Sequence, residues 1–173
     1  MSNFPLIKTF EGTCEYAKVF ERNRDLGSDG TDAGRVIAAR GGRYKINFYP
    51  DDMEAVKEWF KQASVSLSPM GHDRIKLNDG KEYIVPHRDH NPHVLKDGTV
   101  LESTAGAPRV LDADNEPWDT EVDIGNGSRV SVALEVWPLN TKKQRNLRLK
   151  AVKVLEHVEF QPLINPEDEW AIG

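Results

Sequence analysis

Residues 124–140 read IGNGSRVSVALEVWPLN, and residues 145–160 read RNLRLKAVKVLEHVEF. In the first stretch every second residue from Val130 to Val136 is aliphatic, a period of two that is typical of a β-strand with one buried face. The second stretch begins with the same alternation, but its valines at 152 and 154 are out of phase with Leu147 and Leu149. This slip predicts a β-bulge near Ala151. The two stretches therefore predict a hairpin of two long strands, joined by a polar loop from Leu139 to Asn146.

The predicted hairpin is basic, although the chain as a whole is acidic. The net charge is −5, yet the segment from Arg129 to Leu155 holds seven Lys and Arg against one Glu. The last seven residues hold three carboxylates and no base. Because the distribution of charge matters more than its sum, a polyanionic ligand stays compatible with the acidic total. An ordinary solvated surface is the alternative interpretation of the same charges.

Length and composition indicate one globular domain. The 173 residues are 38% hydrophobic and 29% charged, and no apolar run is long enough to span a bilayer. The N-terminus lacks the basic start and apolar core of a signal peptide. The single cysteine, Cys14, cannot form an internal disulfide and fits a reducing compartment. We expect a cytoplasmic protein.

Further elements are expected along the rest of the chain. The stretch from Thr9 to Asn23 alternates as a strand, with Cys14, Tyr16, Lys18 and Phe20 on one face, and residues 24–42, rich in glycine, predict a mobile loop. A second strand is predicted at 43–50, with Tyr44 on its apolar face. A helix is predicted at about 51–64, opened by acidic residues and carrying an apolar stripe. Asn78-Asp79-Gly80 predicts a hairpin turn, and residues 107–111 predict a short strand.

A histidine-rich segment raises the alternative of an enzyme. His87, Asp89, His90 and His93 lie within seven residues and could hold zinc in a metal-dependent hydrolase. The prolines at 86 and 92 exclude the regular helix on which zinc hydrolases place their ligands. A polar loop that donates to phosphate through Arg88 and ring nitrogens is the favoured interpretation. We predict no catalytic residue, no metal and no cofactor.

The order of these features resembles the single-stranded DNA-binding proteins of tailed bacteriophages of the T-odd type. The resemblance covers most of the chain but is specific only in the C-terminal third. It is carried by Gly125, Gly127, Ser128, Val130, Val132, Leu147, Leu149, Val152, Glu159 and Phe160. It implies a mainly β OB-fold, a five-stranded antiparallel barrel with one packed helix at about 51–64. It also implies roles in phage DNA replication, recombination and strand annealing.

The same resemblance implies two parts, a DNA-binding domain at 1–160 and an acidic C-terminal tail at 161–173. In the phage family this tail is long, strongly acidic and ends in an aromatic residue, and it contacts replication partners. The present tail is short, which leaves partner binding less well supported than DNA binding. Its candidate partner-binding residues are Glu167, Asp168, Glu169 and Trp170.

Sequence-independent binding of a single strand requires cations along the backbone and flat side chains beneath the bases. Cations gather around the second predicted strand and around the hairpin loop, and two such clusters beside one barrel face would form a groove. The candidate nucleic-acid-binding residues are Arg35, Arg40, Arg43, Tyr44, Lys45, Tyr49, His87, Arg88, Trp137, Lys142, Lys143, Arg145, Arg148 and Lys150. Alternatively, Tyr44 fills the core and Trp137 covers a barrel end. A barrel that binds only protein is a third interpretation, and a homodimer is compatible with all of them.

Overall fold

The computed structural model of the chain describes residues 6–67, 73–101, 105–138 and 145–159. Its first half holds β1 (Leu6–Lys18), the single-turn helix η1 (Glu21–Asn23), α1 (Asp32–Ala39), β2 (Arg43–Pro50) and α2 (Met53–Gln62). Five short strands follow: β3 (Lys76–Asn78), β4 (Lys81–Tyr83), β5 (His87–Asp89), β6 (His93–Val94) and β7 (Val100–Leu101). The described part ends with β8 (Arg109–Leu111), β9 (Arg129–Pro138) and β10 (Arg145–Glu156).

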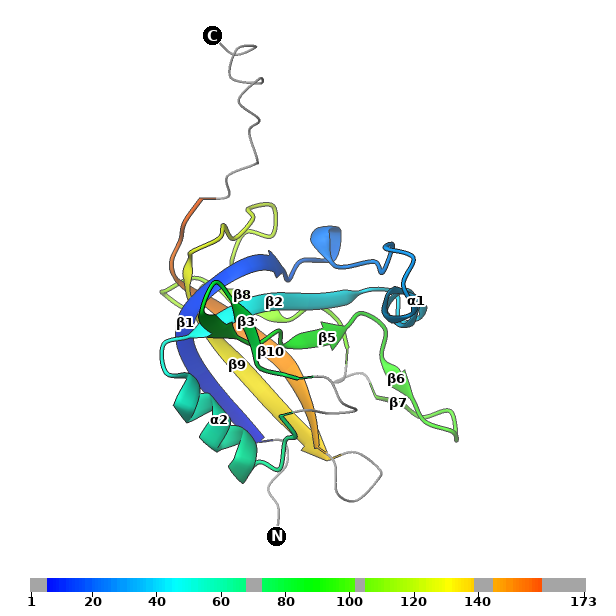
Figure 1. Cartoon of the computed structure of the whole chain (residues 1–173). Helices are drawn as coiled ribbons and strands as arrows, with labels where there is room; N and C mark the ends of the chain where they lie inside the picture. Colours follow the sequence, from blue (N-terminus) through cyan, green and yellow to red (C-terminus); the bar gives the residue numbers. More distant parts are fainter. Residues whose placement is uncertain (1–5, 68–72, 102–104, 139–144, 160–173) are drawn as a thin grey trace.

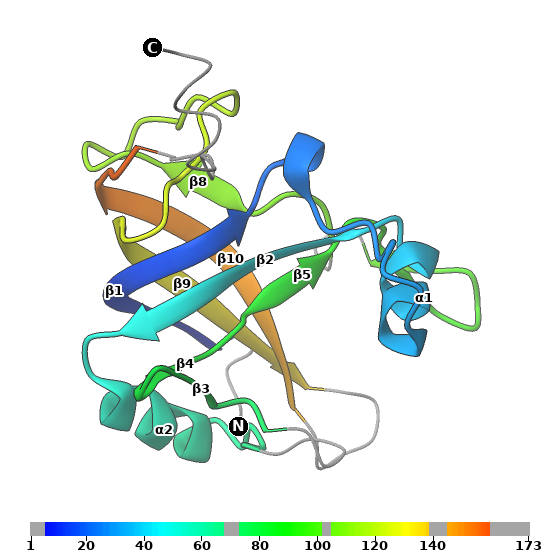
Figure 2. The same cartoon turned by 45° about the horizontal axis from the view of Figure 1, so that its top comes forward.

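The central sheet has the strand order β5-β2-β1-β9-β10-β8. Figures 1 and 2 show it curling until β5 returns to the side of β10, where the Arg88 guanidinium donates to the Leu149 carbonyl at 3.4 Å. The chain is therefore mainly β with an OB-like barrel, as predicted. The sheet contains one strand more than expected, because β8 pairs with β10 in parallel while the other neighbours are antiparallel.

The predicted hairpin is confirmed, together with its bulge. Leu149 of β10 lies opposite Leu134 of β9, but the next pair joins Ala151 to Ala133, so Lys150 is the extra residue. The bulge restores the apolar register, and Val152 then faces the core beside Val132. The shift in hydrophobic phase along the sequence therefore corresponds to a real shift in strand pairing.

The core lies inside the curled sheet and beneath α2. Alternate residues of β9 and β2 are buried, as the period of two predicts. The predicted helix at about 51–64 is confirmed as α2, which buries Val56 and Phe60. The Asp52 carboxylate accepts a hydrogen bond from the Ala55 N–H at 3.1 Å and caps the helix. The strand at 43–50 and the hairpin formed by β3 and β4 are also confirmed.

Two expectations for the N-terminal half are wrong. Residues 24–42 are not all loop, because they contain α1, capped by the Thr31 hydroxyl, which accepts from the Gly34 N–H at 2.9 Å. The helix is short and its surroundings are rich in glycine, which hides it in the sequence. The alternation predicted through Phe20 also breaks, since the pairing of β1 with β2 shifts between Glu15 and Lys18. As a result Ala17 is buried and Tyr16 is exposed.

The two predicted parts, 1–160 and 161–173, stay a prediction, since the tail lies outside the described residues. No helix in the described ranges is long and apolar enough to cross a membrane.

Candidate nucleic-acid interface

A row of polar side chains runs along the side of β2 that faces away from the core. Because Tyr44, Ile46 and Phe48 point inward, the alternate residues Arg43, Lys45, Asn47 and Tyr49 point outward. Six steps of about 3.3 Å, from Arg43 to Tyr49, give this row a length of about 20 Å. Strand pairing places Asp89 beside Arg43, His87 and Lys18 beside Lys45, and Glu15 beside Asn47. These eight residues, Glu15, Lys18, Arg43, Lys45, Asn47, Tyr49, His87 and Asp89, are called the β2 face below.

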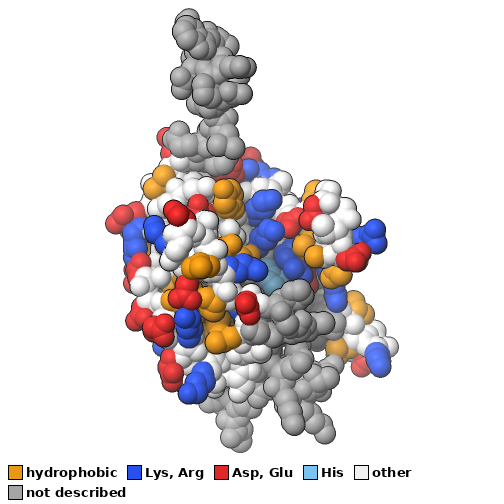
Figure 3. All heavy atoms as spheres, viewed as in Figure 1, with side chains coloured by type: hydrophobic (Ala, Val, Ile, Leu, Met, Phe, Trp, Pro, Cys, Tyr) orange, Lys and Arg blue, Asp and Glu red, His pale blue; other side chains and the backbone are white. Residues whose placement is uncertain are grey.

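Two of the three cations of the β2 face, Arg43 and Lys45, are held in place by carboxylates. The Arg43 Nε lies 3.2 Å from Oδ1 of Asp89, and the Lys45 Nζ lies 2.8 Å from Oδ2 of Asp25. The hydrogen bond from Lys45 lowers the pKa of Asp25, and Lys18 adds a smaller effect in the same direction. Figure 3 shows Lys and Arg side chains gathered over β2 and β5 around a histidine, between the barrel and the lobe that carries α1. The middle of the face is therefore a set of ordered cations.

His87 lies among these charges as a neutral ring. Burial lowers its pKa to about 4, and the positive charge of Arg43 acts in the same direction. The ring is therefore uncharged near neutral pH and can offer a hydrogen bond but no ion pair to a phosphate. No group of three His, Cys, Asp or Glu side chains in the described residues is placed to hold a metal ion. The side chain of His93 is not among those described.

The predicted aromatic residues of β2 have different surroundings. Tyr44 is only 1% exposed, and its hydroxyl lies 2.7 Å from Nδ1 of His90, so its ring belongs to the core rather than to the surface. Tyr49 is half-buried on the β2 face, with its ring 5.0 Å from the ring of Tyr83 and its hydroxyl accepting from Asn78 at 3.1 Å. Burial raises the pKa of Tyr49. Of the two, only Tyr49 has its ring on the outward side of β2.

The remaining predicted cations lie on β5 and on or next to α1, and they have different roles. Arg88 donates to the carbonyls of Ala105, Gly106 and Leu149, so it joins β5 to β10 and to the segment before β8. Arg35 is exposed on α1 and lies 3.2 Å from Asp32. Arg40 ends the same helix, with its backbone N–H donating to the Ile37 carbonyl. Arg88 thus supports the barrel, and Arg35 belongs to a separate lobe.

The predicted hairpin cluster is described only in part. On β10 the Lys150 Nζ lies 3.4 Å from a carboxylate oxygen of Glu135, and Arg148 lies 4.0 Å from the other. Glu135 is only 4% exposed although it is on the outward phase of β9, so this carboxylate is covered by the cations that it binds. Lys142 and Lys143 lie outside the described residues, as do the side chains of Trp137 and Arg145.

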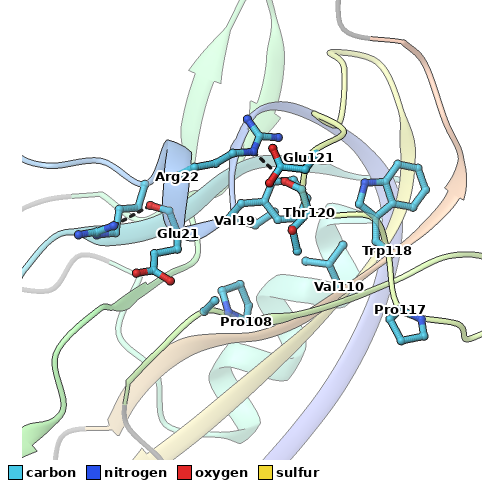
Figure 4. A pocket seen from close by; sticks show the side chains of 12 residues that line it. Val19, Glu21, Arg22, Pro108, Val110, Pro117, Trp118, Thr120 and Glu121 are labelled. Carbon is cyan, nitrogen blue, oxygen red and sulfur yellow. Dashed lines mark hydrogen bonds between the residues drawn. The ribbon is translucent and has the colours of Figure 1, made fainter.

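A separate cleft of about 730 Å³ lies between residues 19–24 and the segments 107–110 and 117–121. Figure 4 shows Trp118, Pro108 and Val110 on its apolar side and Arg22 on its rim. Arg22 binds Asp123 at 2.6 Å and lies over the Phe20 ring, while Arg24 donates to the Glu21 carbonyl at 2.6 Å. Glu21 and Glu121 balance these two arginines. These four side chains therefore leave the cleft without net charge.

Sequence reasoning missed four residues that shape these surfaces: Lys18, Asp25, Glu135 and Tyr16. The alternation of the sequence places Lys18 on a strand face but does not reveal that it pairs with Lys45 across the sheet. Asp25 and Glu135 lie 20 and 15 residues from the lysines that they bind, Lys45 and Lys150. These ion pairs can be inferred only when it is known which residues lie opposite one another in the sheet.

Comparison with solved structures shows the same fold in phage proteins. The crystal structure of gp2.5, a single-stranded DNA-binding protein of bacteriophage T7, matches with a TM-score of 0.56 and 18% identity, over 95% of this chain and all of that one. The single-stranded DNA-binding protein of bacteriophage Enc34, solved in complex with single-stranded DNA, matches with a TM-score of 0.54 and 17% identity, over 90% and 89% of the two chains. Its C-terminal truncation matches with a TM-score of 0.53 and 19% identity, over 90% and 88%. No protein-family model and no curated protein matches the sequence.

Proposed function

We propose that this protein binds single-stranded DNA without sequence preference, along the β2 face. The observation that carries the proposal is the row in which Arg43 and Lys45 stand beside Lys18, with the Tyr49 ring at the far end. Separate cations fit the phosphates of an extended strand, and a ring edge fits an unstacked base. The shared fold with two phage proteins that bind such strands supports the same assignment.

The basic loop of the β9–β10 hairpin belongs to the same proposal. Lys142, Lys143 and Arg145 would extend the phosphate path beyond the β2 face, and Trp137 would offer a second ring. We place the activity in phage DNA replication and recombination in the host cytoplasm, with protection of exposed strands as the direct effect. The acidic residues Glu167, Asp168 and Glu169, together with Trp170, are proposed to contact a replication protein.

A salt series with a labelled oligo-dT tests the electrostatic part. Each phosphate neutralised on a single strand contributes about −0.7 to the slope of log K against log salt concentration. Replacing both Arg43 and Lys45 by Ala should therefore reduce the magnitude of the slope by about 1.4. The triple replacement of Lys142, Lys143 and Arg145 by Ala should reduce it by about 2.

Lys57→Ala is the matched control, because Lys57 is also ion-paired, to Glu54 and Glu82, but lies on α2. This variant should keep the slope of the unmodified protein. A slope near zero for the unmodified protein, or an equal loss in the control, would rule out the proposed interface. A parallel series with oligo-rU reports any preference between DNA and RNA.

A further inference from the structure

Among the tyrosines of the described residues, Tyr16 is the most exposed. Its backbone is also in an unfavourable conformation. Its side chain is 63% exposed and its φ is +49°, in the left-handed region that bulky residues rarely occupy. Within the described part of the chain its side chain makes no hydrogen bond and no ring contact. A large aromatic side chain is therefore presented to solvent at a cost in backbone strain, and packing does not explain it.

Contacts with a distant turn hold this conformation. The Tyr16 N–H donates to Oδ1 of Asn126 at 2.8 Å, across 110 residues of sequence. On the same side, the Cys14 N–H donates to the Ser128 carbonyl and the Gly127 N–H donates to the Cys14 carbonyl. The next residue, Ala17, is buried and anchors the bulge from the other side. Strained backbone persists where the surrounding structure determines it in this way, and it is concentrated at functional sites.

The register of β1 places Tyr16 at the margin of the β2 face. Glu15 pairs with Asn47 and Lys18 pairs with Lys45, and the pairing shifts between them. Tyr16 therefore lies on β1 between the residues that pair with Asn47 and Lys45, two residues before Lys18. β-Bulges commonly redirect a side chain in this manner next to binding sites.

We propose that Tyr16 is a stacking platform for one nucleobase of the strand whose phosphates lie on Lys18 and Lys45. This proposal rests on the proposed single-stranded DNA binding. It adds one contact residue, and it directs the path of the bound strand across β1 rather than only along β2. The ligand at Tyr16 is a planar base without a required sequence, because stacking uses the ring face that every base has.

Affinity for oligo-dT at fixed salt tests the proposal with three variants. Tyr16→Ala should weaken binding about 5- to 150-fold, the range expected for loss of one stacked base. Tyr16→Phe should bind within about twofold of the unmodified protein, because the ring is kept. Tyr16→Leu should lose nearly as much as the Ala variant, because it is apolar but not flat. Equal binding by the Leu and Phe variants, or no loss on Tyr16→Ala, would overturn the stacking proposal.

Two further measurements separate the possible failures. An oligo-dT carrying 5-iodouracil should cross-link to Tyr16 under ultraviolet light, and mass spectrometry of the peptide would identify the residue. Absence of this cross-link, while the unmodified protein binds oligo-dT with the expected salt slope, overturns the role of Tyr16 and leaves the proposed function standing. No binding by the unmodified protein overturns both. A Tyr16→Ala variant with unchanged DNA affinity but altered self-association would assign the ring to a protein contact instead.

The hydrogen bond from Tyr16 to Asn126 provides a positioning control. Asn126→Ala removes the acceptor and should weaken oligo-dT binding severalfold when Tyr16 is present, but add little to the Tyr16→Ala variant. Asn126→Asp keeps an acceptor oxygen and should preserve most of the affinity at high salt. Additive losses from Asn126→Ala and Tyr16→Ala would show that Asn126 does not act through Tyr16.

Discussion

The Lys45 ammonium donates to Oδ2 of Asp25 at 2.8 Å, so the cation at the middle of the β2 face is already bound to a carboxylate. A phosphate that reaches Lys45 must displace or share this partner. Asp25 also accepts the Gly27 N–H at 2.9 Å, and its backbone pairs with Arg43. One aspartate therefore orders the segment before α1 and offsets the positive charge at the middle of the β2 face.

Asp25→Asn should raise the affinity for oligo-dT at low salt. The amide oxygen can still accept from Gly27, while the negative charge beside Lys45 is removed. The gain should shrink as salt rises above about 0.1 M, where the Debye length falls to about 10 Å. Titrations at two salt concentrations measure the effect, with Glu54→Gln as the control, since Glu54 pairs with Lys57 on α2. Unchanged affinity at low salt would mean that Lys45 does not meet a phosphate.

Stability should fall in mild acid because of His87. The folded state holds the pKa of this ring at about 4, below the ordinary value of 6.5, so the unfolded chain binds a proton first as the pH falls. The free energy of unfolding should thus decrease between about pH 6.5 and pH 4, by at most about 1.4 kcal/mol per pH unit, and this contribution should level off below pH 4. Urea unfolding at several pH values measures it. His87→Gln should flatten this part of the curve, and an equally steep curve in that variant would assign the effect to other groups.

Trp137→Ala tests whether Trp137 is a second residue that stacks on a base. Stacking on a base would make oligo-dT quench tryptophan fluorescence, and the substitution should cost about 1–3 kcal/mol of binding while the fold persists. The expected result is lost affinity with little change in melting temperature. A large fall in melting temperature with unchanged affinity would instead place Trp137 over the end of the barrel. Trp118→Phe is the control for the quenching, because Trp118 lies at the separate cleft and donates to the Val122 carbonyl.

Removal of residues 162–173 tests the acidic tail. Its three carboxylates can compete with DNA for the basic surface as an intramolecular ligand. The truncated protein should bind oligo-dT more tightly at low salt and about equally at high salt, because salt screens the competition. Equal affinity at low salt would show that the tail does not guard the interface. Loss of folding would show that residues 162–173 belong to the domain.

Local patterns were sufficient for the main strands and for α2. The alternation from Val130 to Val136 assigns one buried face without knowledge of any partner strand, because side chains point to opposite faces with a period of two. The phase slip after Leu149 located the bulge for the same reason. The stripe that includes Val56 and Phe60 predicted which side of α2 is buried. The basic character of Arg43 and Lys45 and their outward phase could likewise be inferred from the sequence.

The composition of the site was decided by contacts between distant residues. The sequence could not show that Asp25 binds Lys45, that Glu135 is buried between β10 cations, or that Arg88 joins β5 to β10, because each depends on strand register across a turn or a curled sheet. Tyr44 and Tyr16 are two further examples, one buried and one exposed by tertiary contacts. The local alternation left Tyr44 open as a stacking residue and placed Tyr16 on the face of Cys14, whereas barrel closure buries the first ring and a hydrogen bond to Asn126 turns the second outward. A period of two determines the faces of a strand only while its pairing stays in register, and the tertiary structure decides where that register breaks.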